Sequence, residues 1–136
     1  MNRKNVTAII EANVLGFTIY SDNLPGITGH GETIEDAKRN IKESISQVLK
    51  RHYQKRTKPP IFLSGVSFIW IYKYDVESIF KYFPLLDSTS FIKNLKLHPT
   101  LLYQHKTGIT LASEKQMQKI INSLHSLGRE LLSIRM

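Results

Sequence analysis

Cysteine is absent from the 136 residues of the chain, which excludes disulfide bonds, thiolate zinc sites and a cysteine nucleophile. The chain also has no run of about 18 apolar residues, so no segment is predicted to span a membrane. The basic N-terminus is not followed by the apolar stretch of a signal peptide, so we expect a cytoplasmic protein. The five histidines form neither an HxH nor an HExxH pair, and we expect neither a metal ion nor a cofactor.

Acidic residues are fewer than basic residues, 11 against 19, which gives a formal net charge of +8. The densest basic segment is residues 50–58, which holds five cations and no acid. A basic balance favours a polyanionic partner such as nucleic acid. The same segment also suits a solvated helix end beside a basic linker, because the helix dipole favours cations at the C-terminus. Both interpretations of residues 50–58 remain open.

The first part of the chain has the pattern of three short strands and one helix. The strands are predicted over residues 6–10, 17–21 and 27–31, with a proline–glycine turn before the third. Apolar residues then recur at three- and four-residue intervals, which predicts an amphipathic helix. This helix begins at Thr33, a good N-cap, and its apolar face continues to Leu49.

An aromatic and β-branched segment after this helix predicts a fourth strand over residues 65–74. The order β-β-β-α-β predicts a small α+β domain over residues 1–75. One helix covers only one face of such a sheet. We therefore expect a homodimer or tetramer to bury further surface.

The second part of the chain has the pattern of four helices. The first two are predicted over residues 76–83 and 89–95, and Pro99 suits the first position of the third. Gly108 ends the third helix, and Ser113 caps the fourth, with a glutamine three residues later for a capping box. The fourth helix carries a long apolar stripe that we interpret mainly as core. The stripe consists of Met117, Ile120, Ile121, Leu124, Leu127, Leu131 and Leu132.

Two short helices separated by about three residues are typical of a helix-turn-helix. We therefore predict an all-α helix-turn-helix DNA-binding domain over residues 76–136, with its recognition helix over residues 99–107. An outward glutamine there can bond adenine through two hydrogen bonds, and lysines can contact phosphate. The alternative is that these residues are ordinary surface polar residues. The candidate DNA-binding residues are Thr100, Tyr103, Gln104, Lys106, Lys93 and Lys96.

Three residues depart from the usual helix-turn-helix pattern. Ile92 stands where alanine usually allows close helix packing, and His105 stands where a larger apolar residue usually completes the core. Lys96 stands where glycine usually adopts the left-handed conformation, which costs a lysine roughly 1 kcal/mol. The turn is therefore less well specified than in a typical motif.

The first part of the chain resembles a known family. Residues 7–11 read Thr-Ala-Ile-Ile-Glu, residues 22–26 read Asp-Asn-Leu-Pro-Gly, and residues 29–37 read Gly-His-Gly-Glu-Thr-Ile-Glu-Asp-Ala. This combination, over residues 6–49, resembles the N-terminal domain of HicB-type antitoxins. Residues 75–132 resemble the Xre-type helix-turn-helix often appended to it. The resemblance implies a trimmed RNase H-like fold that oligomerises and binds a small RNA-cleaving HicA toxin.

We therefore expect a non-enzymatic, antitoxin-like transcriptional regulator that binds duplex DNA, its own operator, and a toxin. The resemblance implies a basic HicA-type toxin, so the complementary surface would be acidic or apolar. The candidate toxin-binding residues are Asp22, Glu32, Trp70 and Tyr72.

The sequence leaves three alternatives open. The first is a stand-alone DNA-binding regulator whose N-terminal domain only oligomerises. The second is an RNA-binding module that uses residues 50–58. The third alternative is a metal-dependent nuclease, for which several carboxylates must converge. The acidic residues available for it are Glu11, Asp22, Glu32 and Asp36.

Overall fold

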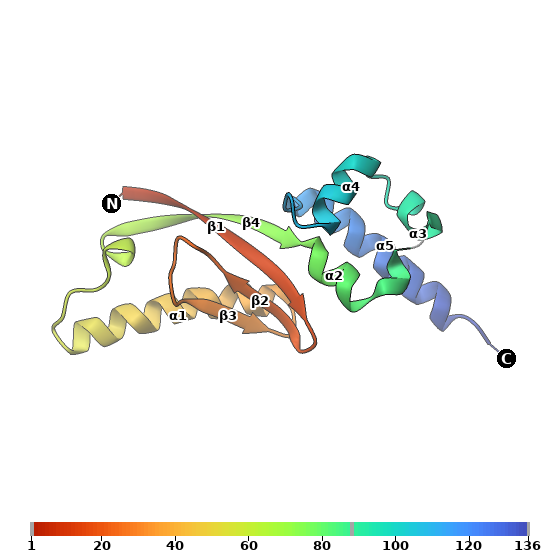
Figure 1. The fold of residues 1–136 in the computed structure, drawn as a ribbon. Coiled ribbons are helices and arrows are strands. Elements are labelled where there is room, and N and C mark those ends of the chain that lie inside the picture. Colours follow the sequence, from red (N-terminus) through yellow and green to blue (C-terminus); the bar gives the residue numbers. More distant parts are fainter. Residues whose placement is uncertain (1, 88, 136) are drawn as a thin grey trace. The chain divides into compact units, whose positions relative to one another are not determined.

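The computed structural model describes residues 2–87 and 89–135 and divides into two compact units, Met1–Lys73 and Tyr74–Met136. The described residues form a four-stranded sheet and five α-helices, which confirms the α+β class (Figure 1). The unit boundary precedes the predicted boundary by two residues. The reason is that Tyr74 exchanges backbone hydrogen bonds of 3.1 and 3.3 Å with Ala112 of the second unit.

The first unit contains a sheet with the strand order β3-β2-β1-β4. β1 and β2 pair antiparallel, with Ile10 opposite Ile19, and β2 and β3 pair antiparallel, with Thr18 opposite His30. The arrows of β1 and β4 point in the same direction in Figure 1. The strands are β1 (Asn2–Asn13), β2 (Gly16–Tyr20), β3 (Thr28–Gly31) and β4 (Val66–Asp75).

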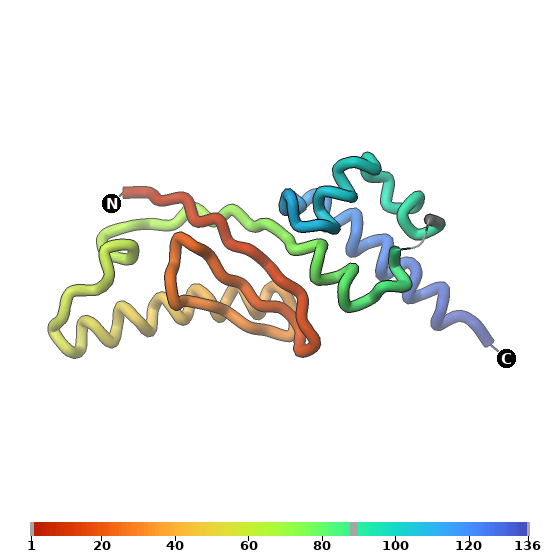
Figure 2. The backbone as a smooth tube through the Cα atoms, viewed as in Figure 1, coloured from red at the N-terminus to blue at the C-terminus, as the bar shows by residue number. Residues whose placement is uncertain are grey.

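Helix α1 (Ile34–Gln54) packs on one face of this sheet through buried Ala37, Ile41 and Ile45. Thr33 caps it as predicted, because the Thr33 side chain accepts a hydrogen bond from a first-turn backbone N–H. Figure 2 shows the chain leaving α1 and returning into β4 through a short 3₁₀ turn, Ile61–Leu63.

The two glycines of β3 explain how closely α1 packs. A Cβ atom on Gly29 would lie 2.5 Å from the backbone of Ala37 and of Ile41, and one on Gly31 would lie 2.6 Å from the Ala37 nitrogen. Side chains at these two positions would push the helix away from the strand. Glycine at alternate positions therefore sets the distance between α1 and β3.

The second unit consists of helices around an apolar core. Buried apolar residues come from α2 to α5 and from the turn after α3: Ile79, Phe80, Phe91, Leu95, Leu102, Met117 and Ile120. The helices are α2 (Val76–Tyr82), α3 (Thr89–Asn94), α4 (Pro99–Lys106) and α5 (Glu114–Leu132), with a 3₁₀ turn η2 (Pro84–Leu86).

Several predicted helix ends are confirmed. Pro99 is the first residue of α4, and Gly108 follows its C-cap with φ +79°. Ser113 and Gln116 form the predicted capping box at the start of α5. These signals are local, so they depend on neighbouring residues in the sequence and not on tertiary contacts.

Two predictions need correction. The first strand was predicted too short at both ends, because β1 runs over Asn2–Asn13 rather than over residues 6–10. The α5 stripe is core only in its first half: Met117 and Ile120 are buried, whereas Leu131 is 58% and Leu132 87% exposed. None of the helices in the described part of the chain has the length and apolar character needed to cross a membrane.

Candidate nucleic-acid interface

The turn between α3 and α4 contains the backbone conformation expected of a helix-turn-helix. Lys96 has φ +55°, in the left-handed region where glycine is usual. The preceding residue, Leu95, is 1% exposed and anchors the turn in the core. After the turn, the His98 side chain accepts a hydrogen bond of 3.2 Å from the Thr100 backbone N–H and caps α4. The turn is therefore fixed by packing on one side and by a cap on the other.

Helix α4 has one face in the core and one in solvent. Leu102 and His105 are buried, whereas Thr100 is exposed and Tyr103 is 59% exposed. Gln104 is half-buried at the margin of the exposed face. A helix that presents a threonine, a tyrosine and a glutamine along one side offers both donors and acceptors to a nucleic-acid groove.

The imidazole of His105 completes the core in place of the expected apolar residue. It is 2% exposed, and its Nδ1 lies 3.1 Å from the Thr110 carbonyl oxygen, while its Nε2 lies 3.2 Å from Gln116 Oε1. Gln116 Oε1 also accepts the Ser113 backbone N–H at 2.9 Å, so His105 is joined to the capping box of α5. His105 is thus a packed histidine with polar partners.

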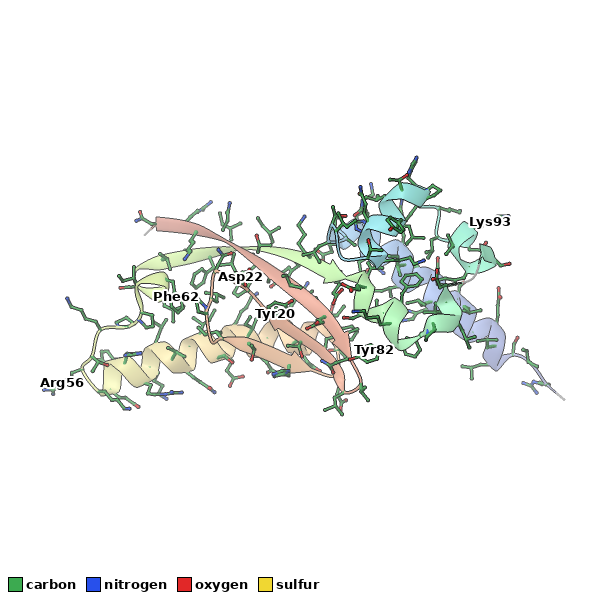
Figure 3. All side chains as sticks on the ribbon, viewed as in Figure 1. Tyr20, Asp22, Arg56, Phe62, Tyr82 and Lys93 are labelled. Atoms are coloured by element: carbon green, nitrogen blue, oxygen red, sulfur yellow. The ribbon has the colours of Figure 1, made fainter. Side chains whose placement is uncertain are left out.

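The three candidate lysines differ in their surroundings. Lys93 and Lys96 are exposed, and Figure 3 shows Lys93 on α3. Lys106 is turned inward, with its side chain 19% exposed. Its Nζ pairs with Asp87 and lies 5.2 Å from the centre of the Phe80 ring. The ion pair and the ring contact hold the Lys106 side chain within the second unit. Lys106 is therefore a weaker candidate for a phosphate contact than Lys93 or Lys96.

The acidic candidates of the first unit lie apart from each other. Asp22 is exposed in the turn after β2 (Figure 3), and Glu32 is exposed just after β3. Because β2 and β3 are antiparallel, with Tyr20 opposite Thr28, these two positions are at opposite ends of β3.

The aromatic candidates lie on the opposite edge of the sheet, on β4. Trp70 and Tyr72 are half-buried and stack with ring centres 6.0 Å apart. Lysines of α1 cover them, with Lys38 Nζ 4.1 Å from the Tyr72 ring centre and Lys42 Nζ 5.8 Å from that of Trp70. The structure therefore does not bring the four candidate toxin-binding residues into one patch.

The basic segment 50–58 is divided between a helix end and a loop. Residues 50–54 belong to the last turns of α1, and Lys55 is its C-cap. Arg56, labelled in Figure 3, has φ +54°, and the Thr57 N–H donates to the His52 carbonyl at 3.0 Å. The segment is thus a helix end followed by a basic loop, which is the arrangement of the second interpretation.

The acidic residues considered for a nuclease do not converge. Asp36 pairs with Arg39 at 3.0 Å on the first turn of α1. Over residues 2–87 and 89–135, no group of three or more histidine, aspartate or glutamate residues is placed to hold a metal ion.

The chain matches no protein-family model, no curated protein and no solved structure. The class of protein is therefore inferred from the residues and geometry described above.

Proposed function

We propose that the protein is a transcriptional regulator that binds duplex DNA through α4. The observation that carries this proposal is the left-handed turn at Lys96 between two short helices, followed by a helix with an exposed polar face. Thr100, Tyr103 and Gln104 would read bases, and Lys93 and Lys96 would contact phosphates. The formal charge of +8 supports association with a polyanion.

Fluorescence anisotropy tests this proposal with the duplex upstream of the protein's own gene and a scrambled duplex, at two salt concentrations. We expect a preference of roughly 10³-fold or more for the upstream duplex. Gln104→Ala should remove most of that preference, because it removes the amide that bonds a base. Gln118→Ala is the matched control, since it removes an exposed glutamine from α5. Equal, strongly salt-dependent binding to both duplexes would contradict sequence-specific regulation.

We propose in addition that the first unit binds a small basic toxin of the HicA type, which makes the regulator an antitoxin. The strand order β3-β2-β1-β4, with β1 and β4 in the same direction and α1 on one face, supports this role. The element order β-β-β-α-β of this unit is the one read from the sequence over the region that resembles HicB. Exposed Asp22 and Glu32 supply negative charge near β3 for a basic partner.

Inhibition of RNA cleavage by a HicA-type toxin tests the second role. The intact protein should suppress cleavage, and Asp22→Asn combined with Glu32→Gln should weaken the suppression. Glu43→Gln, an exposed acid on α1, is the control of equal chemistry. Specific DNA binding without any toxin inhibition would leave a stand-alone regulator whose first unit serves only for oligomerisation.

A further inference from the structure

Strand β4 carries three aromatic side chains on the face of the sheet that bears α1. Phe68, Trp70 and Tyr72 occupy alternate positions, so they point to the same face. The rings of Phe68 and Trp70 meet edge to face, and those of Trp70 and Tyr72 stack, each pair with ring centres 6.0 Å apart. All three rings are half-buried. We call them the aromatic row, which extends over about 13 Å of strand.

Lysines of α1 lie over this row. The helix packs against β3 and β2, whereas β4 forms the opposite edge of the sheet from β3. It reaches the row through two lysines one turn apart, with Lys38 over the Tyr72 ring and Lys42 over the Trp70 ring. The later lysine thus meets the earlier aromatic residue. Helix and strand therefore run in opposite directions, and the Phe68 end of the row lies toward the end of α1.

The end of α1 and the loop after it supply an excess of positive charge. Residues 38–60 contain eight lysine or arginine residues and one acid, Glu43. The five cations of residues 50–58 are exposed, and none of them forms a salt bridge with a described residue. Figure 3 shows Arg56 where the chain leaves α1 and Phe62 where it returns toward β4. This charge therefore lies at the end of the unit from which the aromatic row begins.

Tyr53 adds a fourth aromatic ring among these cations. It is 85% exposed and lies 11 residues after Lys42, close to three helical turns, so both side chains are on the same side of α1. The turn that follows is held in place, because the Arg56 N–H donates to the Tyr53 carbonyl at 3.2 Å. Aromatic rings and cations thus extend together from the aromatic row to residues 50–58.

We propose that this surface binds a single strand of nucleic acid. Bases stack on the rings, and phosphates lie along the lysines and residues 50–58, the combination used in single-strand binding that tolerates any sequence. A base can replace a lysine over a ring, since a stacked base contributes more than a cation–π contact at an exposed site. The displaced ammonium group then meets phosphate. A duplex fits less well, because its bases already stack on each other.

Trp70 is the only tryptophan in the chain, so its fluorescence reports directly on the proposed surface. Titration of the full chain with an oligouridylate of about 12 nucleotides should quench this fluorescence. Free tryptophan is the control for light absorbed by the bases. An abasic strand of equal length keeps the charge without the bases and should bind roughly 10-fold more weakly or less. Equal binding of the two strands, or binding without quenching, would overturn the proposal.

Two substitutions test the rings and the charge separately, with affinity measured by anisotropy of a labelled oligouridylate. Tyr72→Leu should weaken binding roughly 10-fold, whereas Tyr82→Leu, which removes a 48% exposed ring from α2, should not. Lys42→Gln should reduce the slope of log affinity against log salt by about 0.7. Lys115→Gln removes an exposed lysine from α5 and should leave the slope unchanged.

This proposal does not depend on duplex or toxin binding, and one variant separates it from the proposed role of α4. The full chain with both Lys93→Ala and Lys96→Ala should still show quenching of Trp70 by the oligouridylate. Loss of quenching in this variant, or normal affinity in Tyr72→Leu and a normal slope in Lys42→Gln, would overturn the proposal. Circular dichroism verifies that each variant is folded. If Tyr72→Leu does not fold, the exposed position of Lys42 keeps the test available.

Discussion

Lys96 holds a conformation that is unfavourable for any residue with a Cβ atom, and the surrounding turn keeps it there. Replacing Lys96 with glycine should raise the free energy of unfolding by about 0.5–1 kcal/mol, after allowance for the greater freedom of glycine in the unfolded chain. Urea denaturation of the full chain measures the change. Lys96→Ala is the control, because it removes the charge and keeps the Cβ atom. Equal stability of the two variants would show that the turn is not strained.

His105 combines burial with hydrogen bonds on both ring nitrogens. His105→Ala should lower the free energy of unfolding by about 2–4 kcal/mol, because it leaves a cavity and removes the partner of the Thr110 carbonyl. Thermal denaturation followed by circular dichroism detects this loss. His125, exposed on α5, is the matched control, and its replacement by alanine should change stability by less than about 0.5 kcal/mol. Similar effects of the two substitutions would contradict the core role of His105.

At the scale of elements, the contact of α1 with β3 depends on glycine. Gly29→Ala should destabilise the protein by about 2–3 kcal/mol, because the new methyl group overlaps the backbone of α1. The same substitution at Gly128 should instead stabilise by about 0.5–1 kcal/mol, since Gly128 lies within α5 with nothing within 4 Å of the added Cβ. Urea denaturation of both variants gives the comparison. A loss at both positions would mean that overlap with α1 is not the cause.

The elements that the sequence predicted well are those with local signals. Ser113 and its partner are three residues apart, and Pro99 and Gly108 act on their own backbone, so their effects need no tertiary structure. The start of β1 at Asn2 lacks such a signal, because polar residues join a strand only when a neighbouring strand pairs with them.

In the candidate interface too, features set by local sequence were predicted and features set by tertiary contacts were not. The exposed face of α4 follows from helical periodicity, and the left-handed conformation at Lys96 was expected from the position of glycine in the helix-turn-helix pattern. The inward position of Lys106 does not, because its partner Asp87 is 19 residues away and the contact needs the folded unit. The exposure of the end of α5 was not predicted for a similar reason. An apolar stripe on a helix indicates that its side chains favour burial, but it does not show which surface they pack against.

At the scale of the whole molecule, basic charge is present in both units. Met1–Lys73 holds 11 basic and 6 acidic residues, net +5, and Tyr74–Met136 holds 8 and 5, net +3. Replacing Lys93 and Lys96 together with alanine should reduce the slope of log affinity for duplex DNA against log salt by about 2, one unit for each lost phosphate contact. Lys106→Ala should leave the slope unchanged, because Lys106 pairs with Asp87. Anisotropy titrations over a series of salt concentrations measure the slopes, and an equal loss for Lys106→Ala would refute the assignment.

The position of β4 at the sheet edge affects how the chain behaves at high concentration. Its residues 68–72 are aromatic or β-branched on both faces, and Ile69 and Ile71 are 42% and 38% exposed. The strand at the other edge, β3, has only four residues, two of which are glycines. It is therefore poorly suited to pairing with a strand of another chain. An edge strand with apolar residues on both faces is the kind of segment from which β-aggregation begins. A charged residue introduced at Ile69 would therefore act as a gatekeeper against precipitation during expression and refolding.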